Sequence, residues 1–456
     1  LAREAALTYG EDADRDVSLR VISDHLRGIT VLVSEGVIPG PEKRGAVLRK
    51  ILRRALRHGR LLELPTPFLH RHVADVVEIL APSYPELGDN REIIEKVVRR
   101  EEERFEQTLS DGFERLEASI DQLLAKEQHT FPGDEAFVLE SERGLPLDLI
   151  RDALEERGLR LDEDSYNAAR AEHVEASRVV KGDAASSPAL ARLAEWQGHG
   201  SKYAGHAAMR VEATEVRAVL TMEGEPLERL EEGGAGQVIL EETPLYAESG
   251  GQVGDKGLLA GAGVRARVET THSPVPEVIV HHVLVEHGTL RPGDVVVAEV
   301  DDEHRAGARR HHTATHLLHA ALRETLGTYV KQSGSLVAPD RLRFDFSHYE
   351  SISSDDLEKI ERHMNRNVLR DLPVTDEEME LEQALDSGAL AFFGDRYGSH
   401  VRVIRVGDIS AELCGGTHVS RTGEIGPCRI VQERGAAAGV RRIEAVVGVA
   451  RSEEHT

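Results

Sequence analysis

Two histidines in one predicted helix have the spacing of a metal-binding pair. The segment HHTATHLLH (residues 311–319) places His312 and His316 four positions apart. Because an α-helix makes one turn in about 3.6 residues, the two rings project from one face, about one turn apart. A zinc protease of the HExxH type would need Glu directly after the first histidine, and this chain has Thr313 there. The pair therefore predicts metal binding without peptide hydrolysis.

A second pair with the same spacing combines sulfur and nitrogen. The segment ELCGGTH (residues 412–418) contains Cys414 and His418, and Gly415 and Gly416 between them permit a tight turn. Ligands that are all nitrogen or sulfur favour zinc over magnesium or calcium. The alternative is that the histidines are packing residues and the cysteine is a small buried apolar residue. Taken together, the two pairs predict one zinc ion with four ligands: His312, His316, Cys414 and His418.

A glycine-dense segment, YAESGGQVGDKG (residues 246–257), contains the polar residues Glu248, Gln252 and Asp255. It predicts either a tight hairpin or a loop that closes on a substrate. Neither a GxxxxGK[ST] loop nor a GxGxxG fingerprint is present, so the sequence gives no support for ATP or dinucleotide binding by this chain. Four further histidines are interpreted as surface or packing residues: His281, His282, His311 and His319.

The N-terminal part of the chain has the apolar period of amphipathic helices, with apolar residues every three or four positions through residues 1–180. Residues 46–58 predict a helix with one apolar and one basic face. Because the whole chain carries a net charge of −25, a local basic face favours a defined docking surface for nucleic acid. A charge run at residues 95–104 predicts a solvated helix face. The basic residues in and beside the helix predicted at residues 46–58 are Lys43, Arg44, Arg49, Lys50, Arg53, Arg54, Arg57 and Arg60.

The composition changes near residue 200. Residues 181–202 are rich in Ala, Gly and Ser, which predicts a linker or an exposed connection. From 205 to 300, short β-branched runs between turn signals predict a small β-barrel. Helix and strand patterns then alternate, which predicts an α+β fold. The predicted fold is multidomain: an all-α helical domain (1–200), then a small β-barrel (201–300), then a zinc-binding α+β domain (301–450), then a tail (451–456).

Length and composition exclude several classes of protein. At ~150 residues per domain, 456 residues suffice for about three domains. No apolar run approaches the ~20 residues of a membrane helix, so no membrane association is expected. Two cysteines cannot form a disulfide framework and no signal segment opens the chain, which favours a cytoplasmic location. Because the first residue is Leu1 and not Met, we expect a piece of a longer protein.

Six segments resemble the signatures of one family, in that family's order. They are RVISDHLRGITVLVSEGVIPG, RGAVLRKILRRALRHG, YAESGGQVGDKG, HHTATHLLHAALRETLGT, ELCGGTH and GVRRIEAVVG. Over almost its whole length, the chain resembles the middle and editing portion of bacterial alanyl-tRNA synthetases. The two metal-binding pairs alone are shared with free-standing editing proteins and with the editing domain of threonyl-tRNA synthetase. The helical half of the chain favours the full synthetase, with alanine tRNA as the partner.

The resemblance implies an editing site in residues 301–450. The four predicted zinc ligands match those of a site that hydrolyses seryl and glycyl esters mistakenly attached to alanine tRNA. The resemblance also implies that Thr315 and Gln332 line this site, and that Arg441 matches a nearby family residue that affects it. A polar group that pairs with a serine hydroxyl is left unpaired when alanine enters, and Thr315 is our candidate for it. The expected enzyme is a ligase fragment with aminoacyl-tRNA deacylase activity.

The resemblance also implies a contact with the tRNA acceptor stem. Asp148, in GLPLDL, matches the residue that reads a G·U wobble pair, and its alternative role is the N-cap of the following helix. The family's usual partner residue is Asn, whereas this sequence has Pro41, which has neither a side-chain amide nor a backbone N–H. Recognition is therefore shifted, or Glu42 and Lys43 compensate. The expected tRNA-binding residues are Asp148, Lys43, Arg44, Arg49, Arg53 and Arg57.

Two parts of the family have no counterpart in this sequence. These are the adenylate-forming core and the C-terminal domain, so we expect ATP and Mg²⁺ only in the full-length enzyme. The terminal RSEEHT (451–456) resembles a translated sequencing adapter, and we expect it to be non-native.

The sequence leaves the role of the metal open. Ester hydrolysis needs a polarised carbonyl and an aimed water, and one zinc ion can provide both. Four protein ligands make a closed structural site, whereas catalytic zinc keeps one position open. We therefore expect one ligand of the 414–418 pair to be loosely held or replaced by water. The alternative is a tRNA-binding module with a purely structural zinc, which predicts metal-dependent folding without hydrolysis. A further alternative is a zinc hydrolase that acts on small molecules, but this function would not explain the basic face of the helix at residues 46–58.

Overall fold

A computed structural model of the chain describes residues 1–40, 43–141, 145, 147–180, 192–196, 200–391, 398–437 and 439–448. The chain divides into two compact units, Leu1–Ala184 and Ala185–Thr456. Most of the predicted linker, Pro41 and the tail at 451–456 lie outside the described residues. The predicted domain limits stay a prediction.

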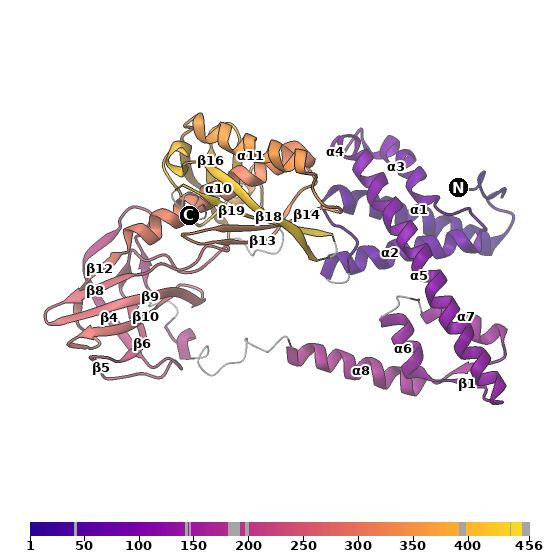
Figure 1. The fold of residues 1–456 in the computed structure, drawn as a ribbon, viewed down its shortest axis with the longest axis horizontal. Coiled ribbons are helices and arrows are strands. Elements are labelled where there is room, and N and C mark those ends of the chain that lie inside the picture. The colour runs from indigo at the N-terminus through magenta and orange to yellow at the C-terminus, as the bar shows by residue number, and fades with distance from the viewer. Residues whose placement is uncertain are drawn as a thin grey trace. The chain divides into compact units, whose positions relative to one another are not determined.

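The first unit is helical except for two very short strands (Figure 1). β1 (Thr130–Phe131) and β2 (Arg160–Leu161) form a parallel pair. The prediction of an all-α domain is wrong to this extent, because two-residue strands are too short to show an alternating pattern. The helices are α1 (Ala13–Ser34), α2 (Lys43–Leu61), the 3₁₀ helix η1 (Leu69–His72), α3 (Val73–Leu80), α4 (Glu86–Asp89), α5 (Arg91–Ala125), α6 (Gly133–Ser141), α7 (Leu147–Glu156) and α8 (Glu163–Val180).

The amphipathic pattern of α1 explains how it packs. Asp12 is its N-cap, and the carboxylate accepts hydrogen bonds from the backbone N–H groups of Asp14 and Arg15. Helix α1 contacts α2, α3 and α5. Its buried apolar residues have the three- and four-residue spacing that the sequence predicts: Leu19, Ile22, Leu26, Ile29 and Val33.

The charge run on α5 includes two buried carboxylates. Glu101 is 5% exposed, and its Oε1 lies 3.4 Å from Nε of Arg49 and 3.1 Å from Nε of Arg53. Glu102 is 3% exposed and accepts hydrogen bonds from three successive backbone N–H groups at the start of η1. The prediction of a solvated face is wrong at these two positions, because a local charge pattern does not show which carboxylates meet donors from other elements.

The second unit begins with a closed six-stranded barrel, in which the strand order is β10-β6-β4-β12-β8-β9. Closure leaves no unpaired strand edge, and valine, leucine and alanine side chains form the buried core of the barrel. Two short pairs accompany the barrel: β3 (Lys202–Tyr203) with β7 (Glu242–Thr243), and β5 (Leu230–Glu231) with β11 (Thr289–Leu290). The barrel strands are β4 (Arg210–Leu220), β6 (Ala235–Leu240), β8 (Gly257–Gly261), β9 (Val264–Val275), β10 (Val278–His287) and β12 (Val295–Val300).

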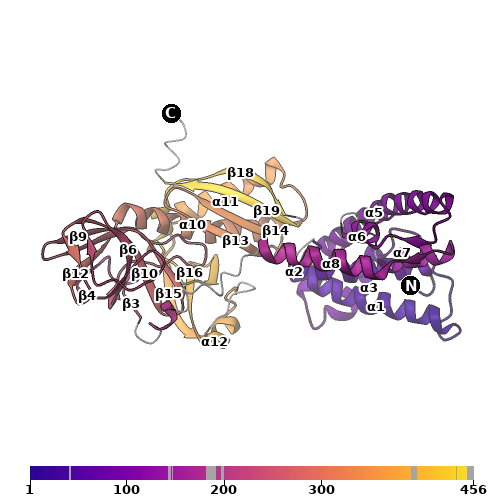
Figure 2. The same ribbon diagram turned by 90° about the horizontal axis from the view of Figure 1, so that it is seen from below.

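The rest of this unit combines helices with two antiparallel sheets. Helices α10 (Asp302–Leu326) and α11 (Ser354–Leu369) pack against the sheet β13-β14-β19-β18 (Figure 1 and Figure 2). Helix α10 also contacts β17, a strand of the second sheet β15-β16-β17. The remaining elements are β13 (Gln332–Val337), β14 (Leu342–Ser347), β15 (Val374–Glu380), α12 (Leu381–Asp386), β16 (His400–Val406), β17 (Ser410–Leu413), the 3₁₀ helix η3 (Thr422–Ile425), β18 (Cys428–Ala437) and β19 (Val440–Val447).

A buried ion pair joins the barrel to α10. Arg305 in α10 is fully buried, and its guanidinium binds both carboxylate oxygens of Asp255, with Nε 2.9 Å from Oδ2. The same guanidinium donates to the backbone carbonyls of Gly205 at 3.0 Å and Pro244 at 2.8 Å. Because these partners satisfy a buried charge, the loop before β8 has a fixed position against α10.

The prediction of a multidomain chain with helices, a barrel and mixed helix–sheet structure is confirmed. Among the described residues, no helix is both long and apolar enough to cross a bilayer.

Candidate metal centre and pocket

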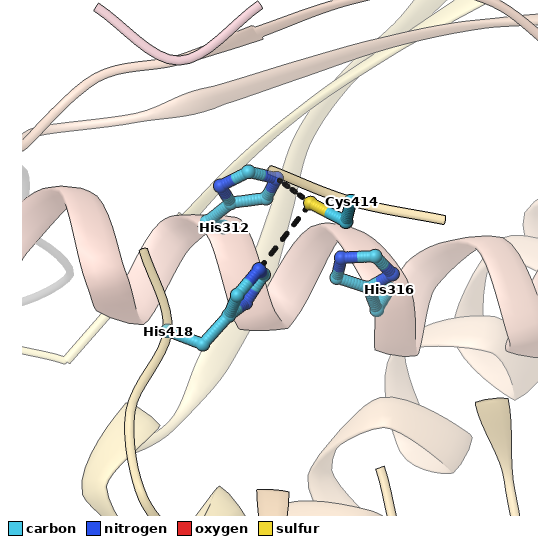
Figure 3. Close-up of side chains that lie close together, drawn as sticks. All are labelled: His312, His316, Cys414 and His418. Atoms are coloured by element: carbon cyan, nitrogen blue, oxygen red, sulfur yellow. Dashed lines mark hydrogen bonds between the residues drawn. The ribbon is translucent and has the colours of Figure 1, made fainter. Parts of the chain in front are cut away.

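Four side chains from two separate segments converge at one point in the second unit. One potential ligand atom from each lies within 4.8 Å of the others. Sγ of Cys414 is 3.3 Å from Nε2 of His312 and 3.4 Å from Nε2 of His418 (Figure 3). His312 and His316 project from one face of α10 with nearly parallel rings, 5.5 Å between centroids. The structure thus brings together the four residues that the sequence predicts as ligands.

Each histidine of this cluster has a hydrogen-bond partner on the ring nitrogen that points away from the cluster. The partners are an amide, a carboxylate and a hydroxyl, and a hydrogen bond at this nitrogen orients metal-binding histidines in other proteins. They leave Nε2 of each ring directed toward the shared point. The contacts are His312 Nδ1 with Gln252 Oε1 at 2.7 Å, His316 Nδ1 with Glu412 Oε2 at 2.7 Å, and His418 Nδ1 with Thr313 Oγ1 at 3.2 Å.

The cluster fits a zinc ion by its chemistry. Nε2 of His316 is buried and has no hydrogen-bond partner among the described residues. Such an atom costs free energy unless a hydrogen-bond partner or a metal satisfies it. Imidazole nitrogen and thiolate sulfur are the ligand types that zinc prefers, and four of them suit its tetrahedral geometry.

The charges around the sulfur favour its thiolate form. Burial raises the pKa of Cys414, but the neighbouring histidines, His312 first, hold it well below its usual value. Burial, with the neighbouring His312, lowers the pKa of His418 to about 3, so this ring is neutral. Burial also lowers the pKa of His316, whereas Glu412 and Cys414 raise it to about 10. A metal ion bound at this point would compete with a proton on this ring.

The turn between Cys414 and His418 requires a glycine at one of its two glycine positions. A Cβ on Gly416 would lie 2.0 Å from Cε1 of His312, whereas a Cβ on Gly415 would have no heavy atom within 4 Å. Nη1 of Arg402 donates to the carbonyls of Gly416 at 2.7 Å and Cys414 at 3.3 Å. Gly416 thus permits the close approach of the turn to α10, and Arg402 holds the turn in place.

A pocket of about 730 Å³ opens beside the cluster, and His312, His316 and Cys414 form part of its wall. Its size is typical of small-ligand sites. Thr315 and Gln332 also line it. Oγ1 of Thr315 donates to the backbone carbonyl of His311 at 2.8 Å.

Arg441 is not part of the pocket wall. It lies in β19, and its Nη2 is 2.8 Å from Oε2 of Glu433. The structure therefore brings Thr315 and Gln332 to the cluster but not Arg441. The role of Arg441 stays a prediction.

Sequence reasoning assigned no role to two residues that contact the cluster. Glu412 stands two positions before Cys414 at the end of a strand, so the two side chains share one face, a signal that strand alternation could have given. Gln252 lies in the glycine-dense segment, and nothing local connects it to His312. The predicted tight turn is present, because Ser249 and Gln252 exchange backbone hydrogen bonds, and Ser249–Gly251 line the pocket. Closure of this segment on a substrate stays a prediction.

Residues of the basic helix α2 differ in exposure. Arg49 and Arg53 are partly buried and pair with Glu101, whereas Lys50 and Arg54 are exposed. Arg44 is exposed and Arg57 is half-buried. The RNA contacts assigned to Arg44, Arg49, Arg53 and Arg57 stay a prediction.

The other two expected tRNA contacts are described only by their backbone. The side chains of Lys43 and Asp148 lie outside what the structure describes. Helix α7 begins at Leu147, so Asp148 lies within its first turn and not at the N-cap position.

Comparison with known proteins identifies two family matches. Residues 2–304 match the family described as tRNA synthetases class II (A). Residues 401–444 match the second additional domain of threonyl and alanyl tRNA synthetases, which includes Cys414 and His418.

Curated relatives are similar over nearly the whole chain. The alanine–tRNA ligase of Delftia acidovorans is 45% identical over 431 residues, 94% of this chain and 48% of the relative. That of Halorhodospira halophila is 45% identical over 95% of this chain and 49% of the relative. That of Nitratidesulfovibrio vulgaris is 42% identical over 97% of this chain and 51% of the relative. The chain spans about half the length of these relatives. Because residues 2–304 match class II synthetases, residues 401–444 match a domain of threonyl and alanyl synthetases, and the curated relatives are alanine–tRNA ligases, the chain belongs to the alanyl-tRNA synthetase family.

Proposed function

We propose that this chain is the tRNA-recognition and editing part of an alanine–tRNA ligase. Its proposed activity is the hydrolysis of serine and glycine esters from mischarged alanine tRNA. The observation that carries this proposal is the convergence of four nitrogen and sulfur ligands on the wall of a pocket of about 730 Å³. The names of the curated relatives support alanine tRNA as the substrate.

The proposed metal is one zinc ion held by His312, His316, Cys414 and His418. When bound, zinc supplies a Lewis acid for an ester carbonyl and lowers the pKa of water. His312 and His316 are 6% and 4% exposed, whereas Cys414 and His418 are half-buried. We therefore assign the cysteine–histidine pair as the more weakly held one.

Thr315 is the proposed group that distinguishes serine from alanine. Its hydroxyl proton is engaged by the carbonyl of His311, so the hydroxyl presents only acceptor lone pairs to the pocket. A serine hydroxyl can donate to this oxygen. An alanine methyl group cannot, and it would leave a polar group of the pocket unpaired.

The helical part is proposed to bind the acceptor stem, with α2 and Asp148 as contacts. The assigned order is a helical tRNA-recognition domain, a β-barrel and an α+β editing domain. ATP and Mg²⁺ belong to aminoacylation by the full-length enzyme, and the proposed location is the cytoplasm.

Deacylation assays test this function directly. We would incubate Ser-tRNA(Ala) and Ala-tRNA(Ala) separately with the wild-type chain, a Cys414→Ala variant and a Cys428→Ala variant. Cys428 is the other cysteine of the sequence, buried in β18 outside the pocket wall, and serves as the matched control. Release of serine by wild type and Cys428→Ala, lost in Cys414→Ala, supports editing. Bound zinc without release of serine favours the alternative, a tRNA-binding module with a purely structural zinc.

A further inference from the structure

We propose that Gln252, contributed by the barrel, is a positioning residue for the metal centre. The inference rests on the proposed zinc site and concerns a residue that is not a ligand. Gln252 is completely buried, and its side chain contacts both segments that carry ligands.

The orientation of the Gln252 amide follows from one backbone contact. The N–H of Thr417 lies 2.9 Å from the side-chain atom assigned as Oε1. Because a backbone N–H can only donate, its partner must be the amide oxygen and not the nitrogen. The amide nitrogen then faces Oγ1 of Thr417 at 2.9 Å and donates to it.

This orientation determines the tautomer of His312. Nδ1 of the ring lies 2.7 Å from the same amide oxygen, so Nδ1 must carry the proton. In the neutral ring the lone pair is therefore on Nε2, which is 3.3 Å from Sγ of Cys414. Gln252 thus fixes both the direction of the ring and the nitrogen available to a metal.

The same side chain also fixes the turn between the other two ligands. Thr417 is the residue before His418, and both its backbone N–H and its hydroxyl are held by Gln252. A Cβ at Gly416 would lie 3.0 Å from Oε1 of Gln252, so the turn fits closely around the amide. One side chain therefore sets the distance between α10 and the 414–418 turn.

Backbone hydrogen bonds hold the loop that carries Gln252 in a fixed position. Ser249 and Gln252 exchange backbone hydrogen bonds at 3.0 and 3.2 Å. Val337 at the end of β13 donates to the carbonyl of Gly251 at 2.7 Å and accepts from the N–H of Val253 at 3.0 Å. The loop that carries Gln252 is thereby paired with β13, the edge strand of the sheet β13-β14-β19-β18.

Metal retention tests the inference without relying on activity. The variants are Gln252→Leu, which keeps the volume but not the hydrogen bonds, and Gln252→Glu, which keeps two acceptor oxygens. The matched control is Gln237→Leu, because Gln237 is a buried barrel glutamine whose amide nitrogen donates only to the carbonyl of Met222. We would measure zinc content, the rate of zinc transfer to a chromogenic chelator, and the absorption spectrum of the Co²⁺-loaded protein.

We expect Gln252→Leu to bind zinc ~10–100-fold more weakly and to change the Co²⁺ spectrum, as loss of a ligand's hydrogen-bond partner does. Gln252→Glu and Gln237→Leu should stay close to wild type. If Gln252→Leu does not fold, Thr417→Val gives a second test, since it removes the hydroxyl that holds the amide, and we expect weaker zinc binding there too.

Three results overturn the inference. The first is zinc affinity of a folded Gln252→Leu equal to that of wild type, and the second is an equal loss in Gln252→Leu and Gln237→Leu. The third is a wild-type chain that binds no zinc, which also overturns the proposed metal site. Loss of deacylation with intact zinc binding in every variant would contradict the positioning role while leaving the proposed function in place.

Discussion

Oε2 of Glu412 lies 2.7 Å from Nδ1 of His316, and both side chains are almost completely buried. The other carboxylate oxygen lies 2.9 Å from Nδ1 of His319. Burial raises the pKa of Glu412, but His316 and His319 hold it well below its usual value, so the group is charged. A buried carboxylate on Nδ1 of a histidine makes Nε2 more basic and fixes its direction. Glu412 therefore sets the basicity and the direction of Nε2 of His316, a proposed zinc ligand.

Replacing this carboxylate should weaken metal binding. We expect Glu412→Gln to lower zinc affinity by ~10-fold or more, because the amide removes the negative charge that makes His316 basic. Glu433→Gln is the control, since Glu433 is also a poorly exposed, paired carboxylate but lies outside the pocket wall. Competition with a chelator measures the affinity. Equal zinc affinity in wild type and Glu412→Gln would show that the carboxylate has only a packing role.

The two glycines of ELCGGTH should respond differently to the same substitution. In Gly416→Ala the new Cβ would overlap His312, so the turn must move and we expect loss of bound zinc. In Gly415→Ala the Cβ meets open space, so we expect zinc content near that of wild type. Metal analysis of the two purified proteins, with circular dichroism as a check of folding, decides between these outcomes. Full zinc content in Gly416→Ala would show that the turn adapts.

The barrel should lose stability at low pH through His281. This ring is completely buried, with Nδ1 facing the carbonyl of Val238 and Nε2 facing the hydroxyl of Thr243. Burial lowers its pKa to about 4, so the unfolded chain binds this proton more readily than the folded one. The stabilisation is complete above pH 6.5 and is lost as the pH falls from 6.5 toward 4, by about 1 kcal/mol per pH unit.

A His281→Gln variant isolates this effect, because glutamine keeps a donor and an acceptor but does not titrate. Trp196, the single tryptophan, packs against the barrel and reports its unfolding by fluorescence. Urea unfolding at pH 7.5 and pH 5 should show a larger loss of stability in wild type than in the variant. Identical losses in both proteins would mean that other groups cause the acid sensitivity.

Neighbouring arginines of α2 should have different roles. Arg54 is exposed, so Arg54→Ala should weaken tRNA binding and reduce the salt dependence by about one ion, with little effect on stability. Arg53 pairs with the buried Glu101 and stacks 5.0 Å from the ring of Phe105, so Arg53→Ala should cost about 2 kcal/mol of stability.

Fluorescence anisotropy with alanine tRNA at several salt concentrations measures binding, and urea unfolding measures stability. The division of roles is wrong if Arg53→Ala changes the salt dependence as much as Arg54→Ala and leaves the stability unchanged.

Local sequence patterns were sufficient for many parts of this molecule. The four-residue spacing of His312 and His316 places both rings on one helix face whatever surrounds the helix. Short β-branched runs between turn signals predicted the barrel that the structure contains. Each of these inferences depends on residues within one or two turns or strands, where backbone geometry alone relates the side chains.

Burial of charge was less predictable. Glu101 and Arg53 belong to different helices, and their pairing removes both from the solvated surfaces that the local patterns predict. The buried pair of Arg305 and Asp255 likewise joins α10 to a loop of the barrel. A charge pattern shows which residues are ionised, but their partners depend on how the elements pack.

The sequence by itself determined the ligand types, their paired spacing and the elements that carry them, because these follow from local geometry and side-chain chemistry. Only the tertiary structure decided that Gln252 and Glu412 accept hydrogen bonds from Nδ1 of His312 and His316, and that Gly416 lets the turn approach α10. The physical reason is that a hydrogen bond or a steric fit acts over about 3 Å, and residues as distant in sequence as Gln252 and His312 come within that range only when the barrel, α10 and β17 pack together.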